Sequence, residues 1–95
     1  MSAQRTPDTR RYRFAQGHRL QWEEAQNCYV ILYPEGMVQL NESAAAILRQ
    51  LDPERTVDDI VEALKAEFPD ADDEIITDIQ EFLEEAENRG WIRQV

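Results

Sequence analysis

The spacing of apolar residues changes near residue 41, and this change limits the fold more than any other feature. Before it, the run Cys28-Tyr29-Val30-Ile31-Leu32-Tyr33 is continuously apolar and rich in β-branched and aromatic residues, as is typical of a central strand covered on both faces. After it, apolar residues return every three or four positions, which is the period of an amphipathic helix. A chain of 95 residues has room for one small domain. We therefore expect an α+β fold in which strands precede helices.

Two shorter strands are expected to flank the central run. The alternation of Leu20 and Trp22 with polar neighbours predicts a half-buried first strand. Tyr33-Pro34-Glu35-Gly36 has proline at the second position and glycine at the fourth, which favours a type I turn into a third strand over residues 37–40. The three strands would form an antiparallel meander whose first and third strands lie at the edges.

Caps and breakers delimit the first two helices. Asn41 is a favourable N-cap for a helix that Asp52-Pro53 would end. Thr56 and Asp59 have the spacing of a capping box, and Pro69 would close the helix that follows.

The third helix completes the outline of a winged helix-turn-helix. Acidic residues 72–74 favour a helix start there, and Gly90 favours a left-handed stop. Trp91-Ile92 could then form a final short extended segment. The expected order βββααα, a small sheet packed on three helices, does not by itself indicate what is bound.

The N-terminal residues show no periodic apolar pattern and carry Arg5, Arg10, Arg11 and Arg13. We expect a flexible arm over residues 1–17 and a single domain over residues 18–95. Whether the arm contacts a partner or has no role is left open. The chain has neither a long apolar run nor the apolar stretch of a signal peptide at its start, so we expect a cytoplasmic protein.

The charge distribution argues against nucleic acid and membranes as partners. Residues 41–95 hold sixteen of the twenty Asp and Glu residues but five of the ten Lys and Arg residues. The third helix, which would enter the major groove in a DNA-binding relative of this fold, is dominated by carboxylates that repel phosphates. A DNA-binding regulator is therefore a poor fit.

Residues that could support catalysis, a metal or a covalent cofactor are few. Cys28 begins the most apolar strand, and the single histidine, His18, lies in no recognisable motif to activate it. The acidic residues near position 72 lack the spacing of a calcium loop and suit a helix start better. Ser43 opens a helix, as the modified serine of a carrier protein does, but without the expected neighbours. We expect no enzyme, no metal and no cofactor.

The third strand is an unguarded sheet edge. Charged side chains protect the first strand, whereas residues 36–40 contain no charge and no proline. A bare edge beside an apolar helix is the arrangement that binds a foreign peptide as an added strand. Another part of this chain, or a second copy in a homodimer, could cover the same edge.

Several short motifs together resemble the PqqD family of pyrroloquinoline quinone biosynthesis. They are Arg19-Leu20-Gln21-Trp22-Glu23, Leu32-Tyr33-Pro34-Glu35-Gly36, Leu40-Asn41-Glu42-Ser43-Ala44 with Ile47-Leu48, and Arg89-Gly90-Trp91. The resemblance runs from about Arg19 to Trp91. One departure is Pro53, where the family tends to have glycine.

This resemblance implies a peptide chaperone, one of the recognition domains for ribosomally made, modified peptides. Such a protein binds the precursor peptide PqqA and presents it to the radical SAM enzyme PqqE. The peptide would add to the third strand and lie against the third helix. By position, the implied contact residues are Met37, Val38, Gln39, Leu40, Ile75, Ile79, Phe82 and Leu83. Arg19 and Trp22 are candidates for facing the enzyme, although Trp22 could instead pack in the core. A general protein-interaction module or a homodimer that uses the same edge is the alternative.

Overall fold

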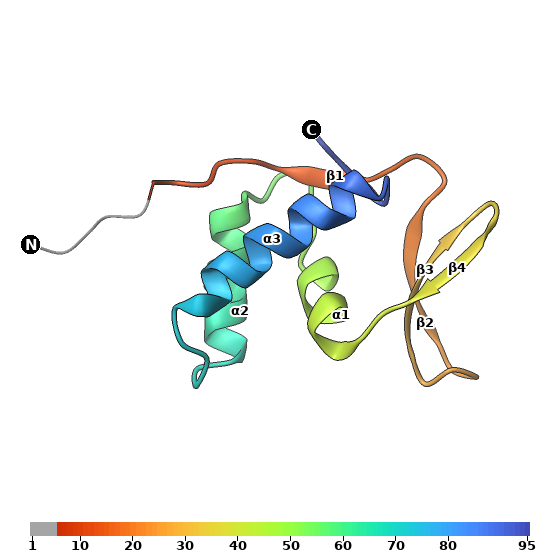
Figure 1. Cartoon of the computed structure of the whole chain (residues 1–95), viewed down its shortest axis with the longest axis horizontal. Coiled ribbons are helices and arrows are strands. Elements are labelled where there is room, and N and C mark those ends of the chain that lie inside the picture. The colour runs from red at the N-terminus through yellow and green to blue at the C-terminus, as the bar shows by residue number, and fades with distance from the viewer. Residues whose placement is uncertain (1–5) are drawn as a thin grey trace, which may run out of the picture.

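The computed structural model describes residues 6–95 and shows three helices beside a small sheet (Figure 1). In chain order the elements are β1 (Tyr12–Phe14), β2 (Arg19–Glu23), β3 (Cys28–Tyr33), β4 (Gly36–Gln39), α1 (Glu42–Arg49), α2 (Val57–Glu67), α3 (Glu74–Asn88) and β5 (Ile92–Gln94). No helix within this part of the chain is both long and apolar enough to cross a membrane.

The main sheet is the expected antiparallel meander, in the order β2-β3-β4. Tyr33 pairs with Gly36, so Pro34 and Glu35 alone form the hairpin turn between β3 and β4. The prediction of three strands packed on three helices is confirmed. The structure adds a second, two-stranded sheet formed by β1 and β5.

Local capping interactions start the first two helices where the sequence predicts them. The Asn41 side chain accepts a hydrogen bond from the N–H of Ala44 at 2.8 Å. Thr56 and Asp59 form the complete capping box at the start of α2. The third helix ends before Gly90, whose φ of 82° lies in the left-handed region that glycine adopts without strain.

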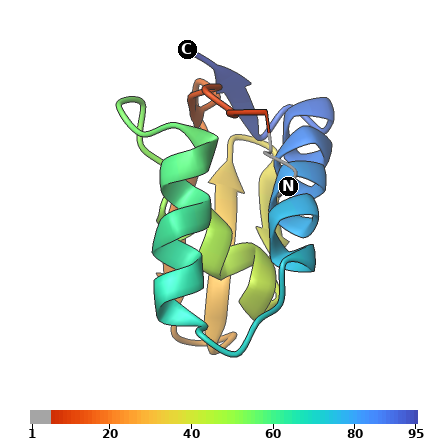
Figure 2. The same ribbon diagram turned by 90° about the vertical axis from the view of Figure 1, so that its left-hand side faces the viewer.

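The core lies between the three helices and one face of the main sheet (Figure 2). Ile31 of β3 is fully buried there, among apolar residues of all three helices. Val30 points to the opposite face, outside this core, yet it is also fully buried. It lies between Gln21 and Gln39 on the neighbouring strands. The core cluster of the helices therefore covers one face of β3 rather than both.

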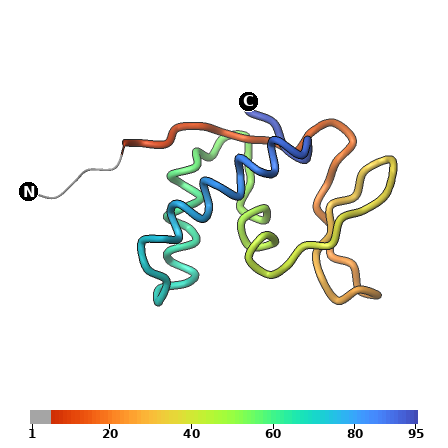
Figure 3. The backbone as a smooth tube through the Cα atoms, viewed as in Figure 1, coloured from red at the N-terminus to blue at the C-terminus, as the bar shows by residue number. Residues whose placement is uncertain are grey.

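The N-terminal segment differs from the flexible arm expected over residues 1–17. Residues 1–5 lie outside the described part, but the chain from residue 6 runs across the helices and joins β5 in an antiparallel pair (Figure 3). Tyr12 is 1% exposed and belongs to the core. The N–H groups of Val57 and Asp58 donate to backbone carbonyls of Arg10 and Asp8. The segment therefore contributes a strand and a core side chain to the domain.

A charged cluster holds this segment against α2 and α3. Arg10 donates to both carboxylate oxygens of Asp8, at 2.9 and 2.7 Å, and also contacts Glu84 of α3. Gln80 of α3 donates to Asp8 at 3.2 Å, and the N–H of Asp8 donates to Asp58 of α2. Hydrogen bonding from Arg10 is the main reason that the pKa of Asp8 lies below its usual value near 3.8.

The Asp8 carboxylate should make the stability of the protein depend on pH under acidic conditions. Its pKa is lower in the folded chain than in the unfolded chain, so its contribution is complete above the unfolded value and is lost as the pH falls through the folded value. We expect Asp8→Asn to lower the free energy of unfolding at pH 7 by about 1–3 kcal/mol. Urea denaturation measured from pH 7 to pH 2.5 should show this difference shrinking below about pH 4. A difference that stayed constant with pH would contradict the assignment.

Candidate functional site

The outer edge of β4 is free within residues 6–95, since β4 ends the sheet order and pairs with β3 alone. None of Gly36, Met37, Val38 or Gln39 carries a charge, and the strand contains no proline. Its outward backbone groups are therefore available to another strand, as the sequence predicts.

The register with β3 identifies which backbone groups point outward. The N–H of Leu40 donates to the carbonyl of Tyr29 at 2.9 Å. Because hydrogen-bonded and non-hydrogen-bonded pairs alternate along an antiparallel ladder, Val38 opposite Ile31 also bonds inward. The N–H groups of Met37 and Gln39 therefore point away from β3, and no strand in the described chain meets them.

The side chains of β4 alternate between its two faces. Val38 packs against the core and Leu40 is buried in it, on the helix side. Met37 and Gln39 point to the other face, where Met37 is 44% exposed. The Gln39 amide donates to the side-chain oxygen of Gln26 at 2.6 Å. An added strand would thus find apolar side chains on one face and exposed ones on the other.

A groove, which we call the β4–α3 groove, runs between the free edge and the third helix. Val38, Gln39 and Leu40 line it on the strand side, and Phe82 and Glu85 of α3 line the other side with Arg89, which caps the end of that helix. The remaining lining residues are Tyr33, Asn41, Ala44 and Trp91.

The helical wall of this groove combines an aromatic ring with a paired charge. Phe82, Glu85 and Arg89 occupy positions i, i+3 and i+7, which share one face of a helix. Arg89 donates to Glu85 at 2.6 Å and lies 5.4 Å from the centre of the Trp91 ring. The wall can therefore contact both apolar and polar groups of a docked peptide.

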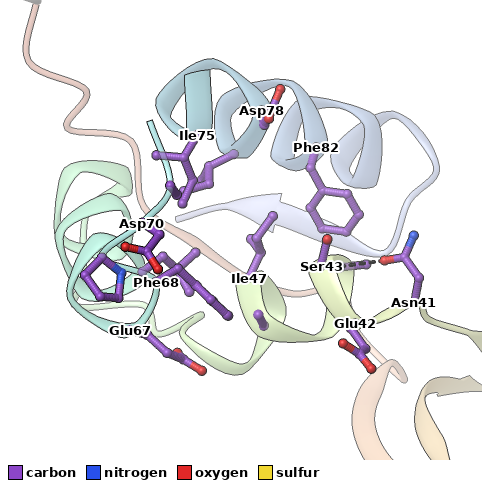
Figure 4. Close-up of a pocket in the computed structure, with 16 residues that line it drawn as sticks. Asn41, Glu42, Ser43, Ile47, Glu67, Phe68, Asp70, Ile75, Asp78 and Phe82 are labelled. Carbon is purple, nitrogen blue, oxygen red and sulfur yellow. Dashed lines mark hydrogen bonds between the residues drawn. The ribbon is translucent and has the colours of Figure 1, made fainter. Parts of the chain in front are cut away.

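A second cavity, which we call the α1–α3 hollow, lies beyond Phe82. Figure 4 shows Ile75 and Phe82 of α3 facing Ile47 of α1, with Phe68 at one end. Its volume is about 870 Å³. Asn41, Ala44 and Phe82 line both this hollow and the β4–α3 groove, so the two are adjacent.

The eight residues that the family resemblance implies to be peptide contacts do not all lie at one place in the structure. Four of them line the β4–α3 groove, namely Val38, Gln39, Leu40 and Phe82. Ile75 and Ile79 line the α1–α3 hollow instead, although Ile79 is 1% exposed. Met37 lines neither cavity and offers its outward N–H. Leu83 has no exposed surface and lines neither, since it packs in the core.

Six groove-lining residues were not among these contacts, namely Tyr33, Asn41, Ala44, Glu85, Arg89 and Trp91. The i, i+3, i+7 spacing of Phe82, Glu85 and Arg89 is the signal that could have identified the two charged ones. The other four depend on how the end of β3, the start of α1 and the turn after α3 come together beside β4, which no local pattern indicates.

The two residues considered for contact with a partner enzyme lie at the opposite edge of the sheet. Arg19 is exposed on β2, and Trp22 is 47% exposed. The Trp22 ring meets Tyr29 edge-on, with 5.2 Å between ring centres. Trp22 shares the helix-side face with Leu20 but is not part of the core, so the alternative that it packs there is wrong.

The side chains considered for catalysis or covalent modification lie in three separate parts of the fold. His18 stacks on Tyr33, and its Nδ1 lies 3.0 Å from the carbonyl oxygen of Gln16. Cys28 is half-buried at the start of β3, and Ser43 lies in the first turn of α1. Among residues 6–95, no group of three or more His, Cys, Asp and Glu side chains is placed to hold a metal ion.

Comparison with known proteins identifies the family of the chain. The family model described as "Coenzyme PQQ synthesis protein D (PqqD)" matches residues 28–92. The chain belongs to the PqqD family. It is 58% identical over 79 residues to the PqqA binding protein of Acinetobacter baylyi, covering 83% of this chain and 79% of the relative. It is 59% identical to the PqqA binding protein of Azotobacter vinelandii, covering 80% and 82% of the two chains.

A solved structure supports the fold as well. The NMR structure of the PqqD truncation of Methylobacterium extorquens PqqCD matches with a TM-score of 0.70 and 32% identity, covering 86% of this chain and 87% of that one. That protein is described as a functional, stand-alone recognition element for ribosomally synthesized and post-translationally modified peptides. The family resemblance and the fold expected from the sequence are therefore confirmed.

Proposed function

We propose that this PqqD protein binds the precursor peptide PqqA in pyrroloquinoline quinone biosynthesis by adding it as a strand to β4. The free edge carries the proposal, because the outward N–H groups of Met37 and Gln39 lie beside an apolar groove. Backbone hydrogen bonds would supply affinity, and the groove would select side chains. The names of the relatives, which are PqqA binding proteins, agree with this role.

The presentation of PqqA to the radical SAM enzyme PqqE is the second part of the proposal. In the strand order β2-β3-β4, Arg19 and Trp22 lie on the strand farthest from the peptide edge. A partner could therefore contact the exposed Trp22 while a peptide occupies β4. In this proposal the protein acts in the cytoplasm as a binding partner, without catalysis or a cofactor of its own.

A backbone NMR titration with synthetic PqqA peptide tests the binding site. We expect the amide signals of Met37 and Gln39 to shift most within β4, and their exchange with deuterated water to slow, because each N–H gains an acceptor. Signals of α2 that face away from the groove should stay in place and serve as the internal control. Binding that left the β4 amides unprotected would contradict strand addition.

Self-association through the same edge is the competing function. Two bare β4 strands could pair across a twofold axis, because an antiparallel pair is self-complementary. Sedimentation over a range of concentrations separates the two cases. A dimer that PqqA peptide does not dissociate would favour the homodimer over the peptide site.

A further inference from the structure

The α1–α3 hollow has an apolar floor that the proposed strand addition does not use. Ile47 and Ile79 are buried at its base, and Ile75 and Phe82 are half-buried along α3. Phe68, which is 44% exposed, lies at the end of the hollow where α2 stops (Figure 4). An exposed aromatic ring beside an apolar cavity is a surface suited to holding an apolar side chain of a ligand.

The rim of this hollow carries charge of one sign. Four carboxylates line it, from Glu42, Glu67, Asp70 and Asp78, and none of its lining residues is Lys, Arg or His. All four side chains are exposed, and no ion pair within the described chain neutralises them. A ligand with basic groups is therefore favoured here, and an acidic one is repelled.

The hollow begins where the β4–α3 groove ends. Asn41, which lies two residues beyond the end of β4, lines both cavities, as do Ala44 and Phe82. A peptide paired with β4 that continues past Leu40 therefore passes Phe82 and reaches the hollow. The two cavities therefore lie next to each other, one beside the sheet edge and the other reaching the end of α2.

We propose that the α1–α3 hollow is a second subsite of the peptide site. It takes an apolar side chain, flanked by basic residues, from the part of the bound peptide that lies beyond the strand added to β4. The floor holds the apolar side chain, and the acidic rim pairs with the basic ones. This inference rests on the proposed binding of PqqA. It adds that residues of the peptide beyond the strand paired with β4 contribute to the affinity.

Charge reversal at the rim tests the electrostatic part. The double variant Glu67→Lys/Asp78→Lys alters exposed rim residues, and Glu54→Lys/Glu62→Lys makes the same change of net charge on exposed residues away from both cavities. Calorimetric titration with synthetic PqqA peptide should show about five- to tenfold weaker binding for the rim variant alone. This difference should shrink in 1 M NaCl, where the screening length is about 3 Å.

Removal of the Phe68 ring tests the apolar part. We expect Phe68→Ala to weaken binding of the PqqA peptide about fivefold, because the ring is 44% exposed at the hollow, and thermal denaturation checks that the variant is folded. Trp22→Ala removes a similarly exposed ring at the far edge of the sheet and should leave the affinity unchanged. A peptide shortened to the strand that pairs with β4 should bind the parent and Phe68→Ala equally.

The outcomes separate this inference from the function on which it rests. If the parent binds PqqA and protects the β4 amides, but the rim variant and Phe68→Ala bind equally well, the second subsite is wrong and strand addition stands. If the parent does not bind PqqA, both proposals are wrong. If Phe68→Ala converts a dimer of this chain to a monomer, the hollow is an interface between copies, which also overturns the inference.

Discussion

Replacing Gln39 with proline is expected to weaken binding of the PqqA peptide at least about tenfold while the domain stays folded. The N–H of Gln39 points outward, so proline removes a donor that only a docked strand would use. One such hydrogen bond contributes about 0.5–1.5 kcal/mol net, and the proline ring also obstructs the approaching strand. Calorimetric titration gives the affinity, and thermal denaturation shows whether the variant is folded.

The neighbouring position supplies a matched comparison. The N–H of Val38 bonds inward to β3, so Val38→Pro breaks the internal ladder and should destabilise the fold by about 3 kcal/mol or more. Gln39→Ala keeps the backbone donor and loses the hydrogen bond to Gln26, so its affinity for PqqA should fall far less than that of Gln39→Pro. If folded Gln39→Pro bound PqqA as tightly as the parent, strand addition at β4 would be wrong.

Truncation of Tyr12 to alanine is expected to cause the largest loss of stability among single changes in the N-terminal segment. The ring is 1% exposed within the core, and truncation of a large buried aromatic side chain costs about 3–5 kcal/mol. A domain of this size is stable by only about 5–15 kcal/mol. We expect the midpoint of thermal unfolding to fall by more than about 12 °C, measured by circular dichroism.

Two further variants of β1 show whether the loss of stability comes from the buried ring of Tyr12. Arg13→Ala changes an exposed neighbour on the opposite face and should leave the midpoint within about 4 °C of the parent. Tyr12→Phe keeps the ring and loses the hydroxyl contacts with Arg10 and Glu87. Its midpoint of thermal unfolding should therefore lie between those of Tyr12→Ala and Arg13→Ala. A Tyr12→Ala protein as stable as the parent would show that β1 contributes little to the fold.

The features that the sequence predicted correctly depend on residues close together in the chain. The capping side chain of Asn41 and the capping box of Thr56 each act within four residues. The same holds for the two-residue turn at Pro34-Glu35 and the left-handed stop at Gly90. The uncharged edge of β4 could be predicted for the same reason, since the absence of charge follows from the residues of that one strand.

The N-terminal strand could not be predicted because its partners are distant. Three residues are too few to show a period, and Tyr12 pairs with Gln94 at the other end of the chain. The lack of an apolar period and the several arginines suggested a flexible arm, but Asp8 and Arg10 pair with each other and with α3 once the chain is folded. Only the tertiary structure turns this polar segment into part of the core.

The apolar stripe of α3 is a second feature whose role in the candidate site could not be predicted from the sequence. Helical spacing places Ile79, Phe82 and Leu83 on the buried side of α3, but it cannot separate a residue that fills the core from one that lines a groove. That choice depends on where β4 and α1 pack against the helix, which exposes Phe82 to both cavities and closes off Leu83.

The direction of each N–H in β4 could not be predicted for a related reason, because it follows from the register with β3. The sequence by itself thus determined the elements from β2 to α3, their order and the bare edge, since local interactions specify them. The tertiary structure alone decided which donors and side chains face the peptide, since packing between distant segments sets them.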